Sequence, residues 1–267
     1  MLAIFLWARF TPPKKTGVVK PPDENTFVTS INSDSILIEA KKRISPELLL
    51  RINTLEHSIS RGDVKDQQIK IYEQLAHIWA DSASSFDPYA WYEAESARLE
   101  NSPKSLNFAA HLFLDNLSRG DNAEKRKWRA LQAKDLFERS LKINPDDDSA
   151  SVGLGACYLF GGISSAPMEG LAKIKKVLDK DSTNVYALMT IARGSLISGQ
   201  YDKAIDRLKA VNRIQPENIE AIIVLADTYE RINDKKNALE WYQKSLKFIN
   251  RQDIKTEVEK RIEDLKK

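Results

Sequence analysis

The sequence predicts an all-α protein in which antiparallel helix pairs stack into a solenoid. The main observation is a repeat: residues 185–188 and 219–222 share one pattern of small and bulky residues, 34 positions apart. Within each copy, the apolar residues recur at helical spacing. A period of this length with helical patterning inside each copy is typical of helical solenoids, in which each unit contacts only its neighbours.

Small residues mark the places where the two helices of each copy should cross. These are Ala192 and Ala204 in the copy that begins at Val185 and Ala226 and Ala238 in the copy that begins at Ile219. The bulky residues around them are Leu188, Ile191 and Leu208 in the former and Ile222, Leu225, Tyr229 and Tyr242 in the latter. The matching positions indicate one helical hairpin used twice in a fixed register.

The composition is that of a folded, water-soluble body. Of 267 residues, 42% are hydrophobic and 30% are charged, and the formal net charge is +3. Up to Ser45 the chain has seven basic and four acidic residues, so the remainder is neutral. A neutral body lacks the usual electrostatic footprint of a nucleic-acid-binding protein, although a local basic stripe stays open.

No motif for catalysis, a cofactor or a metal stands out. Cys157 is the single cysteine, which excludes an intrachain disulfide and leaves the redox compartment open. The three histidines, His57, His77 and His111, lie on three predicted helices, and we find no carboxylate, His or Cys at ligand spacing. The glycine pair Gly161-Gly162 does not form a phosphate-binding loop, because no Lys-Ser or Lys-Thr follows it. We therefore expect no enzyme, no cofactor and no metal.

The first ten residues form a hydrophobic segment that is too short to span a bilayer. Residues 2–10 are apolar apart from Arg9, and nine helical residues rise only about 14 Å. We favour the back half of a membrane anchor, because Trp7 and Arg9 stand where interfacial residues would. A hydrophobic tail at an interface and a tail without any membrane role are the alternatives. We expect association with an inner membrane; whether the body is cytoplasmic or periplasmic is left open.

A linker and degenerate hairpins should follow this segment. Residues 11–45 are expected to be a flexible linker, with a short helix or strand near Ile36. Residues 46–121 should form two degenerate hairpins, because Ser45-Pro46 and Asp87-Pro88 both read as helix starts, each with a cap followed by proline. We pair the helix that starts at Pro46 with its return helix, and the helix that starts at Pro88 with the next one.

A regular array should occupy residues 122–250. Asp121 and Glu124 resemble a capping box that opens a long helix, whose second half fits the repeat as a partial copy. Clear copies follow at residues 148–184, 185–218 and 219–250. The first is three residues longer, and we place the excess in its inter-helix loop. Residues 251–267 have helical spacing and one highly charged face, as a terminal capping helix requires.

The repeat resembles the tetratricopeptide repeat. The positions that carry the resemblance are Gly155, Ala192 and Ala226, the aromatic Tyr158 and Tyr229, Ala204 and Ala238, and the unit-boundary Pro145 and Pro216. Departures at Ser195, Gly170 and Asn250 weaken single copies without changing the period. The run from Phe86 to Gly162 also resembles a group of bacterial, singly membrane-anchored tetratricopeptide proteins without assigned activity.

This resemblance implies a right-handed superhelix whose first helices line a concave groove. By repeat position, the implied partner-binding residues are Val152, Ala156, Leu159, Tyr186, Met189, Arg193, Glu220, Ile223, Asp227 and Glu230. The lysine and asparagine with which some members clamp a peptide carboxylate are absent. Neighbouring helices of the same chain often cover apolar positions of this kind, so self-occlusion is the alternative.

The function expected from these features is a non-catalytic scaffold that binds a protein or peptide and is tethered to a bacterial membrane. An apolar groove that also holds the polar residues Arg193 and Asp227 suits an amphipathic helix or an apolar extended segment. The alternative is a cell-envelope accessory protein that binds a small apolar ligand, for which an enclosed cavity is expected. A third class, a helical-repeat RNA binder, is disfavoured by the neutral body. The oligomeric state is left open.

Overall fold

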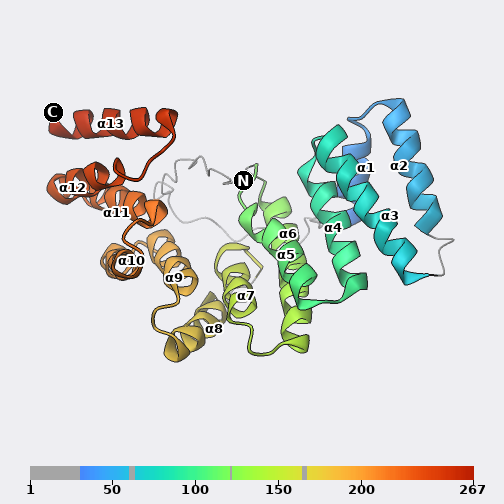
Figure 1. Ribbon diagram of the computed structural model, residues 1–267, viewed down its shortest axis with the longest axis horizontal. Coiled ribbons are helices and arrows are strands. Elements are labelled where there is room, and N and C mark those ends of the chain that lie inside the picture. Colours follow the sequence, from blue (N-terminus) through green and yellow to red (C-terminus); the bar gives the residue numbers. More distant parts are fainter. Residues whose placement is uncertain (1–30, 60–63, 121, 164–166) are drawn as a thin grey trace, which may run out of the picture. The chain divides into compact units, whose positions relative to one another are not determined.

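All secondary structure in the described part of the chain is helical. The computed structural model describes residues 31–59, 64–120, 122–163 and 167–267, and these contain 13 α-helices, one π-helix and no strand (Figure 1). Among these residues, no helix has both the length and the apolar character needed to cross a membrane. The expected anchor at residues 1–10 and the linker through residue 30 lie outside the described residues. The predicted all-α class is confirmed.

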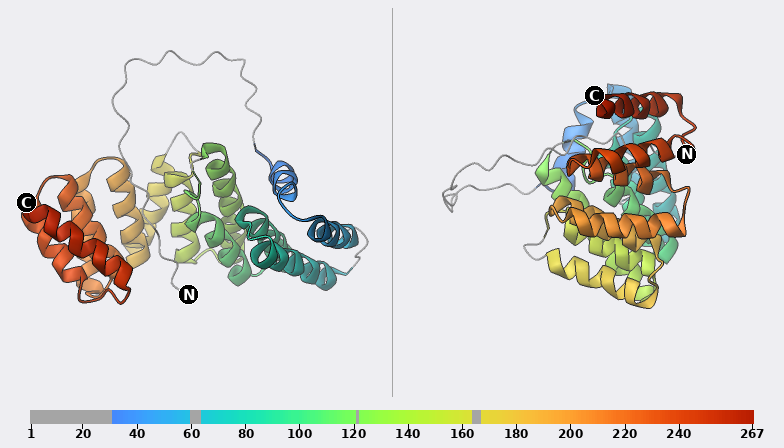
Figure 2. Two further views of the ribbon diagram at one scale, coloured as in Figure 1. Left: turned by 90° about the horizontal axis from the view of Figure 1, so that it is seen from above. Right: turned by 90° about the vertical axis from the view of Figure 1, so that its left-hand side faces the viewer.

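The helices follow one another with short connections. The N-terminal helices are α1 (Ser33–Lys41), α2 (Pro46–Ile59), α3 (Lys65–His77), the π-helix η1 (Ile78–Ser82), α4 (Phe86–Glu100), α5 (Pro103–Asp115) and α6 (Ala123–Ile143). The C-terminal helices are α7 (Asp148–Phe160), α8 (Pro167–Lys180), α9 (Val185–Ile197), α10 (Tyr201–Ile214), α11 (Ile219–Arg231), α12 (Lys235–Ser245) and α13 (Gln252–Lys266). Figure 2 shows the later helices stacked one above another when viewed from their end of the chain.

The helices pair in one register from α3 to α12. The most extensive packing joins α3 with α4, α5 with α6, α7 with α8, α9 with α10, and α11 with α12. The sequence pattern predicted that α2 pairs with α3 and α4 with α5; these helices do touch, but α3 with α4 and α5 with α6 pack more extensively. Helix α5 is the partner that the long helix α6 needed to complete its repeat unit. The array is therefore one unit longer at its N-terminal side than the clear copies indicated.

Side-chain size explains why α5 packs on α6. Ala109 and Ala110 of α5 are fully buried and allow close approach of the neighbouring helix. On the same helix, Phe113 meets Trp128 of α6 edge to face, with ring centroids 5.4 Å apart. The Trp128 indole nitrogen also donates to Ser33 of α1. These contacts belong to one of four apolar clusters strung along the stack, as expected when units contact only their neighbours.

A recurring cap begins the first helix of each regular unit. The side chains of Asp147, Asn184 and Asn218 each accept a hydrogen bond from the backbone N–H three residues later, at 2.9 Å in all three cases. Such a cap satisfies one of the backbone N–H groups that the first helical turn leaves without an intrahelical partner. The polar residue before α7, α9 and α11 thus sets the start of each inner helix.

Two predicted helix starts were wrong in detail. Helix α4 begins after Ser85, and Asp87 lies inside its first turn instead of capping it. Helix α6 is capped by the side chain of Asn122, which accepts from the N–H of Lys125, whereas Asp121 lies outside the described residues. At both starts two short polar residues lie within two positions of each other, so local sequence does not distinguish which of them is the cap.

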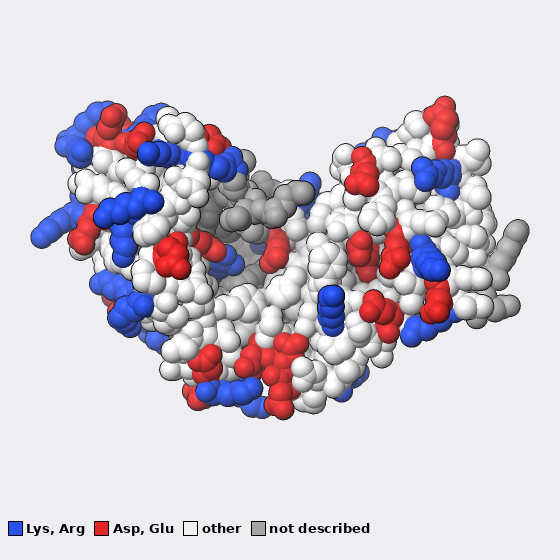
Figure 3. All heavy atoms as spheres, viewed as in Figure 1, with Lys and Arg blue, Asp and Glu red and all other residues white. Residues whose placement is uncertain are grey.

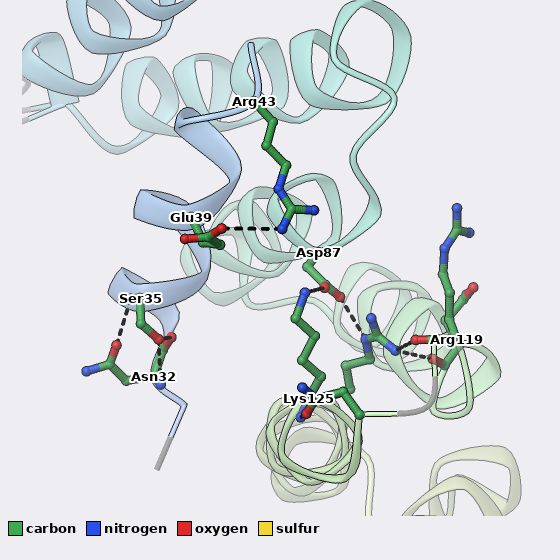
Figure 4. Close-up of polar contacts among 10 residues, drawn as sticks. Asn32, Ser35, Glu39, Arg43, Asp87, Arg119 and Lys125 are labelled. Carbon is green, nitrogen blue, oxygen red and sulfur yellow. Dashed lines mark hydrogen bonds and ion pairs between the residues drawn. The ribbon is translucent and has the colours of Figure 1, made fainter. Parts of the chain in front are cut away.

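A buried ion pair holds α4 to α6. Asp87 and Arg129 are 7% and 3% exposed, and the Arg129 Nε atom donates to the Asp87 carboxylate at 2.7 Å. The same guanidinium donates to the backbone oxygens of Asn116 and Arg119, at 2.9 and 2.6 Å. Lys125 approaches the carboxylate at 3.3 Å (Figure 4). The pair therefore fixes α4, α6 and the turn after α5 at once.

Two glycines allow α7 and α8 to touch through their backbones. A Cβ atom at Gly170 would lie 2.4 Å from the carbonyl oxygen of Gly155, and one at Gly155 would lie 2.8 Å from the carbonyl oxygen of Gly170. Gly170 was noted in the sequence as a departure from the alanine usual in the repeat. The close crossing explains that departure, because no methyl group fits between the helices.

Replacing Gly170 by alanine should destabilise the fold. The forced separation of α7 and α8 should cost about 1–3 kcal/mol of unfolding free energy, measured by urea denaturation with circular dichroism. The matched control is Gly194→Ala on α9, where a new Cβ would meet nothing closer than 3.6 Å. That change should stabilise the protein by up to about 1 kcal/mol through helix propensity. Equal stability of the Gly170→Ala variant and the wild type would contradict the close crossing.

The last helix covers the end of the array. Val258 and Ile262 of α13 are buried against the same cluster as Ala238 and Tyr242 of α12.

Six residues separate α7 from α8, whereas three separate α9 from α10 and α11 from α12. The helix bounds thus place the extra residues of the first copy in its inter-helix loop, as predicted.

Candidate functional site

The first helices of successive pairs form one face of the stack. Helix α5 contacts α7, and α7 contacts α9, directly, so these helices line up on the side opposite α6, α8 and α10. Figure 1 shows α7 and α9 inside the bend and α8 and α10 outside it, and Figure 3 shows the described surface hollowed there. We call the surface of α5, α7, α9 and α11 the inner face.

Three of the ten predicted partner-binding residues are corrected by their burial. Val152, Ala156 and Met189 are 0%, 3% and 6% exposed, so their side chains pack between helices and present no surface to a partner. These positions point back toward the adjoining helix pair, which covers them. The self-occlusion considered for the apolar groove positions therefore holds for these three.

The other seven predicted residues retain solvent contact. They are the half-buried Leu159, Tyr186, Arg193, Ile223 and Asp227 and the exposed Glu220 and Glu230. Arg193 of α9 and Glu220 of α11 form an ion pair across neighbouring units, with side chains 42% and 46% exposed. The part of the inner face that a partner can reach is thus more polar than the sequence predicted.

Two residues that the sequence analysis did not assign to the groove join this surface on α5. The His111 ring lies 5.8 Å from the Tyr186 ring and 5.2 Å, edge to face, from the Phe137 ring. Asp115 lies one turn later on the same helix. We call His111, Asp115, Tyr186, Arg193 and Glu220 the polar cluster; they come from α5, α9 and α11.

The spacing of His111 and Asp115 was a readable signal. The sequence analysis reported no carboxylate at ligand spacing from any histidine, yet Asp115 follows His111 by four residues. On a helix, that spacing puts both side chains on one face. The pair was missed because α5 was read as the second helix of a hairpin and not as an inner helix.

The surroundings alter the protonation of the cluster. Desolvation lowers the pKa of His111, against the opposing effects of Asp115 and Asp147, so this imidazole is neutral near pH 7. Desolvation, together with the charge of Glu220, raises the pKa of Asp115, and the charges of His111 and Arg193 oppose that shift. Burial, and then the charge of Asp115, raises the pKa of Tyr186, which keeps its hydroxyl protonated.

A second network closes the C-terminal end of the inner face. Arg261 of α13 donates to Asp227 at 2.7 Å and to the Tyr242 hydroxyl at 2.9 Å, and that hydroxyl also contacts Asp227. Glu230 accepts from the same hydroxyl at 2.7 Å. Desolvation raises the pKa of Asp227, opposed by Tyr242 and Arg261. Asp227 and Glu230 therefore help to hold the capping helix.

The described residues of the inner face form neither a metal-binding cluster nor an enclosed pocket. Among the described residues, no three His, Cys, Asp or Glu side chains gather as they would around a metal ion. Cys157 is a free, buried thiol whose pKa is raised by burial. Two open depressions, one between α4 and α6 near Asp135 and one between α2 and α3 near Leu50, lie away from the polar cluster.

Comparison with known proteins identifies repeat sequence near the C-terminus. A sequence model described as tetratricopeptide repeat matches residues 195–250, which cover most of the second and third predicted copies. The chain is also 25% identical, over 143 residues, to lipopolysaccharide assembly protein B of Haemophilus influenzae. That alignment covers 52% of this chain and only 35% of the relative, about a third of its length.

Solved structures overlap parts of the helical stack. MamA residues 41 to the end, from Desulfovibrio magneticus RS-1, is 23% identical with a TM-score of 0.45, covering 70% of this chain and 96% of that one. YrrB, titled a TPR protein with an unusual peptide-binding site, is 16% identical with a TM-score of 0.43, covering 77% and 97%. The match shows tetratricopeptide repeat sequence over residues 195–250, and the packed helix pairs show a helical solenoid over the described part of the chain.

Proposed function

We propose that this tetratricopeptide-repeat solenoid is a scaffold that binds a peptide segment of another protein on its inner face. The observation that carries the proposal is the polar cluster. Five hydrogen-bonding side chains from three helices meet on one surface, and the Arg193–Glu220 ion pair is accessible enough to exchange partners. Leu159 and Ile223 add half-buried apolar surface on the same face.

The proposed partner is an amphipathic segment instead of a wholly apolar one. Burial of Val152, Ala156 and Met189 removes the apolar centre on which an apolar peptide would depend. What remains is mixed: ion-pairing groups on α9 and α11 beside partly covered aliphatic side chains. Such a surface gives a bound segment both contact area and charge-based specificity.

We also propose that the scaffold is tethered to a bacterial membrane through residues 1–10. The support is the apolar run with Trp7 and Arg9 at its end, which suits an interfacial position. The alternative function, handling of a small apolar ligand, would need an enclosed apolar cavity. The depression near Asp135 is open and lined mainly by charged side chains, and the one near Leu50 is open to solvent although Leu50 and Leu55 line it, so we rank this function second.

A charge reversal at Arg193 should sharply reduce partner binding. Chemical crosslinking in the cells that produce the protein, followed by recovery of the full chain, should yield about tenfold less partner with Arg193→Glu, because the variant breaks the Arg193–Glu220 ion pair and sets two carboxylates side by side, which rearranges the surface that the segment contacts. The matched control is Lys176→Glu on the outer helix α8, which is exposed and far from the cluster.

The two variants also define the contrary result. Equal partner recovery from Arg193→Glu and the wild type would exclude the inner face as the binding site, and equal loss from both variants would point to a general charge effect.

Fractionation of the same cells into membrane and soluble fractions tests the proposed membrane tether. Protein found only in the soluble fraction would contradict it.

A further inference from the structure

An acidic side chain on the inner face of α5 has no ion-pair partner. Asp115 is exposed at the end of this helix and, among the residues that the structure describes, forms no salt bridge or hydrogen bond. The charges that influence it most belong to His111, Arg193 and Glu220. A carboxylate placed among other charged groups without a counter-ion is ready to accept a cation.

The cluster around Asp115 carries a negative charge of its own. Arg193 is paired with Glu220, so its positive charge is already balanced. His111 is neutral near pH 7, because desolvation lowers its pKa. Asp115 therefore leaves one unbalanced negative charge on the polar cluster, and a cationic group would neutralise it.

The floor of the cluster holds a hydrogen-bonding group without a partner. The hydroxyl oxygen of Tyr186 is buried and forms no hydrogen bond with any described group. Buried hydroxyls in folded proteins are nearly always paired, so an unpaired one calls for a physical reason. The charge of Asp115 helps to raise the pKa of this hydroxyl. A bound segment that moves the side chain of Asp115 or Arg193 would place a hydrogen-bonding group next to this hydroxyl.

An exposed aromatic ring lies on the same stripe of α5 as this carboxylate. Phe108 is 54% exposed, and Leu112 stands between it and Asp115. Residues seven apart share one side of a helix, so the ring and the carboxylate face the same way, about 10 Å apart along the axis. The stripe thus offers an apolar contact at one end and a negative charge at the other.

The distribution of charge over the two sides of the array agrees with a basic guest. Inner helices α7, α9 and α11 carry four acidic and two basic residues. Outer helices α8, α10 and α12 carry eleven basic and five acidic residues. A basic segment is attracted to the inner side and repelled by the outer side.

We propose that the α5 stripe of Phe108, Leu112 and Asp115, together with Tyr186, recognises a lysine or arginine side chain of the bound segment. The cationic head pairs with Asp115, and an apolar side chain of the same segment rests on Phe108. This inference rests on the proposed function and specifies the chemistry of the partner. In a segment with polyproline-II conformation, residues three apart lie on the same side and span about 9 Å, which matches the stripe.

The test uses two small peptides that differ in one charge. The probe is acetyl-Leu-Ser-Ser-Arg-amide, and its control replaces arginine by the neutral isostere citrulline. Each is titrated into the full, ¹⁵N-labelled chain, and binding is followed by NMR shifts of the α5 amides. The arginine peptide should bind about three- to thirtyfold more tightly than the citrulline peptide, and this difference should shrink as salt is added.

Variants assign the effect to one carboxylate. Asp115→Asn should reduce affinity for the arginine peptide to that of the citrulline peptide, whereas Asp179→Asn, at an exposed carboxylate of outer helix α8, should leave it unchanged. Replacing arginine by lysine in the probe identifies the preferred cation. Equal binding of the arginine and citrulline peptides, or no binding of the arginine peptide, would overturn the proposal.

The outcome separates this inference from the proposed function. If Arg193→Glu abolishes crosslinking while both peptides bind alike, the inner face binds a partner without reading a basic side chain. If the arginine peptide binds at Asp115 while Arg193→Glu has no effect on crosslinking, the cation site exists and the scaffold function fails. Each proposal can therefore fail without the other.

Discussion

Replacing Asp87 by alanine should lower the free energy of unfolding by about 3–5 kcal/mol. The substitution leaves the Arg129 guanidinium buried, 3% exposed, without its counter-charge. Two backbone oxygens accept from that guanidinium without supplying the missing full charge, and Lys125 also loses its contact with the Asp87 carboxylate. Urea denaturation followed by circular dichroism measures the loss.

Two comparisons make this result specific. Glu39→Ala removes ion pairs to Lys42 and Arg43 whose side chains are 51–73% exposed, and it should cost about 0–1 kcal/mol; Figure 4 shows the Glu39–Arg43 pair beside the Asp87 site. The double variant Asp87→Ala/Arg129→Met removes both buried charges and should be less destabilised than the sum of the single variants. Additive losses would mean that the two charges are not coupled.

Replacing Phe137 by alanine should cost about 3–5 kcal/mol of unfolding free energy. Its ring is fully buried between α5, α6 and α7. It meets the His111 ring edge to face at 5.2 Å and covers Gly153, where a Cβ atom would lie only 2.3 Å from the ring. No neighbouring side chain can fill the cavity without moving a helix, because α7 approaches through a glycine.

The control for this prediction is an exposed phenylalanine on the preceding helix. Phe108→Ala on α5 should change the unfolding free energy by no more than about 0.5 kcal/mol, because the ring is 54% exposed. A melting curve for each variant decides between them. A loss below about 1 kcal/mol for Phe137→Ala would show that the α5–α6–α7 contact contributes little to the fold.

The regular units were predictable because their signals are local. Small residues at Ala192, Ala204, Ala226 and Ala238 are all fully buried where the helices cross. The terminal helix was also readable, since its apolar residues recur at helical spacing and are buried on one side only. In both cases, the information lies within one or two turns of a helix.

The pairing of the N-terminal helices was not predictable in the same way. Degenerate copies carry no period that would say whether α3 turns toward α2 or toward α4. The decision depends on contacts such as Asp87 with Arg129, which are 42 residues apart. The same pairing makes α5 an inner helix and so brings His111 and Asp115 to the candidate site.

Burial within the predicted groove also depended on neighbouring units. Val152 and Met189 occupy the repeat position of Ile223, and Ala156 occupies that of Arg193. Val152, Met189 and Ala156 are nevertheless covered, whereas Ile223 and Arg193 keep solvent contact. Repeat position states which side of a helix a residue occupies. How much of that side the adjoining helix pair covers follows from side-chain sizes on both helices.

By itself, the sequence determined the helical class, the repeat period and the capping helix, because hydrophobic spacing and cap residues act over a few positions of one helix. Only the tertiary structure decided which helices pair, which groove residues stay accessible and where an unpaired carboxylate meets the inner face. These features arise from packing and charge contacts between segments that are tens of residues apart, and no local pattern records them.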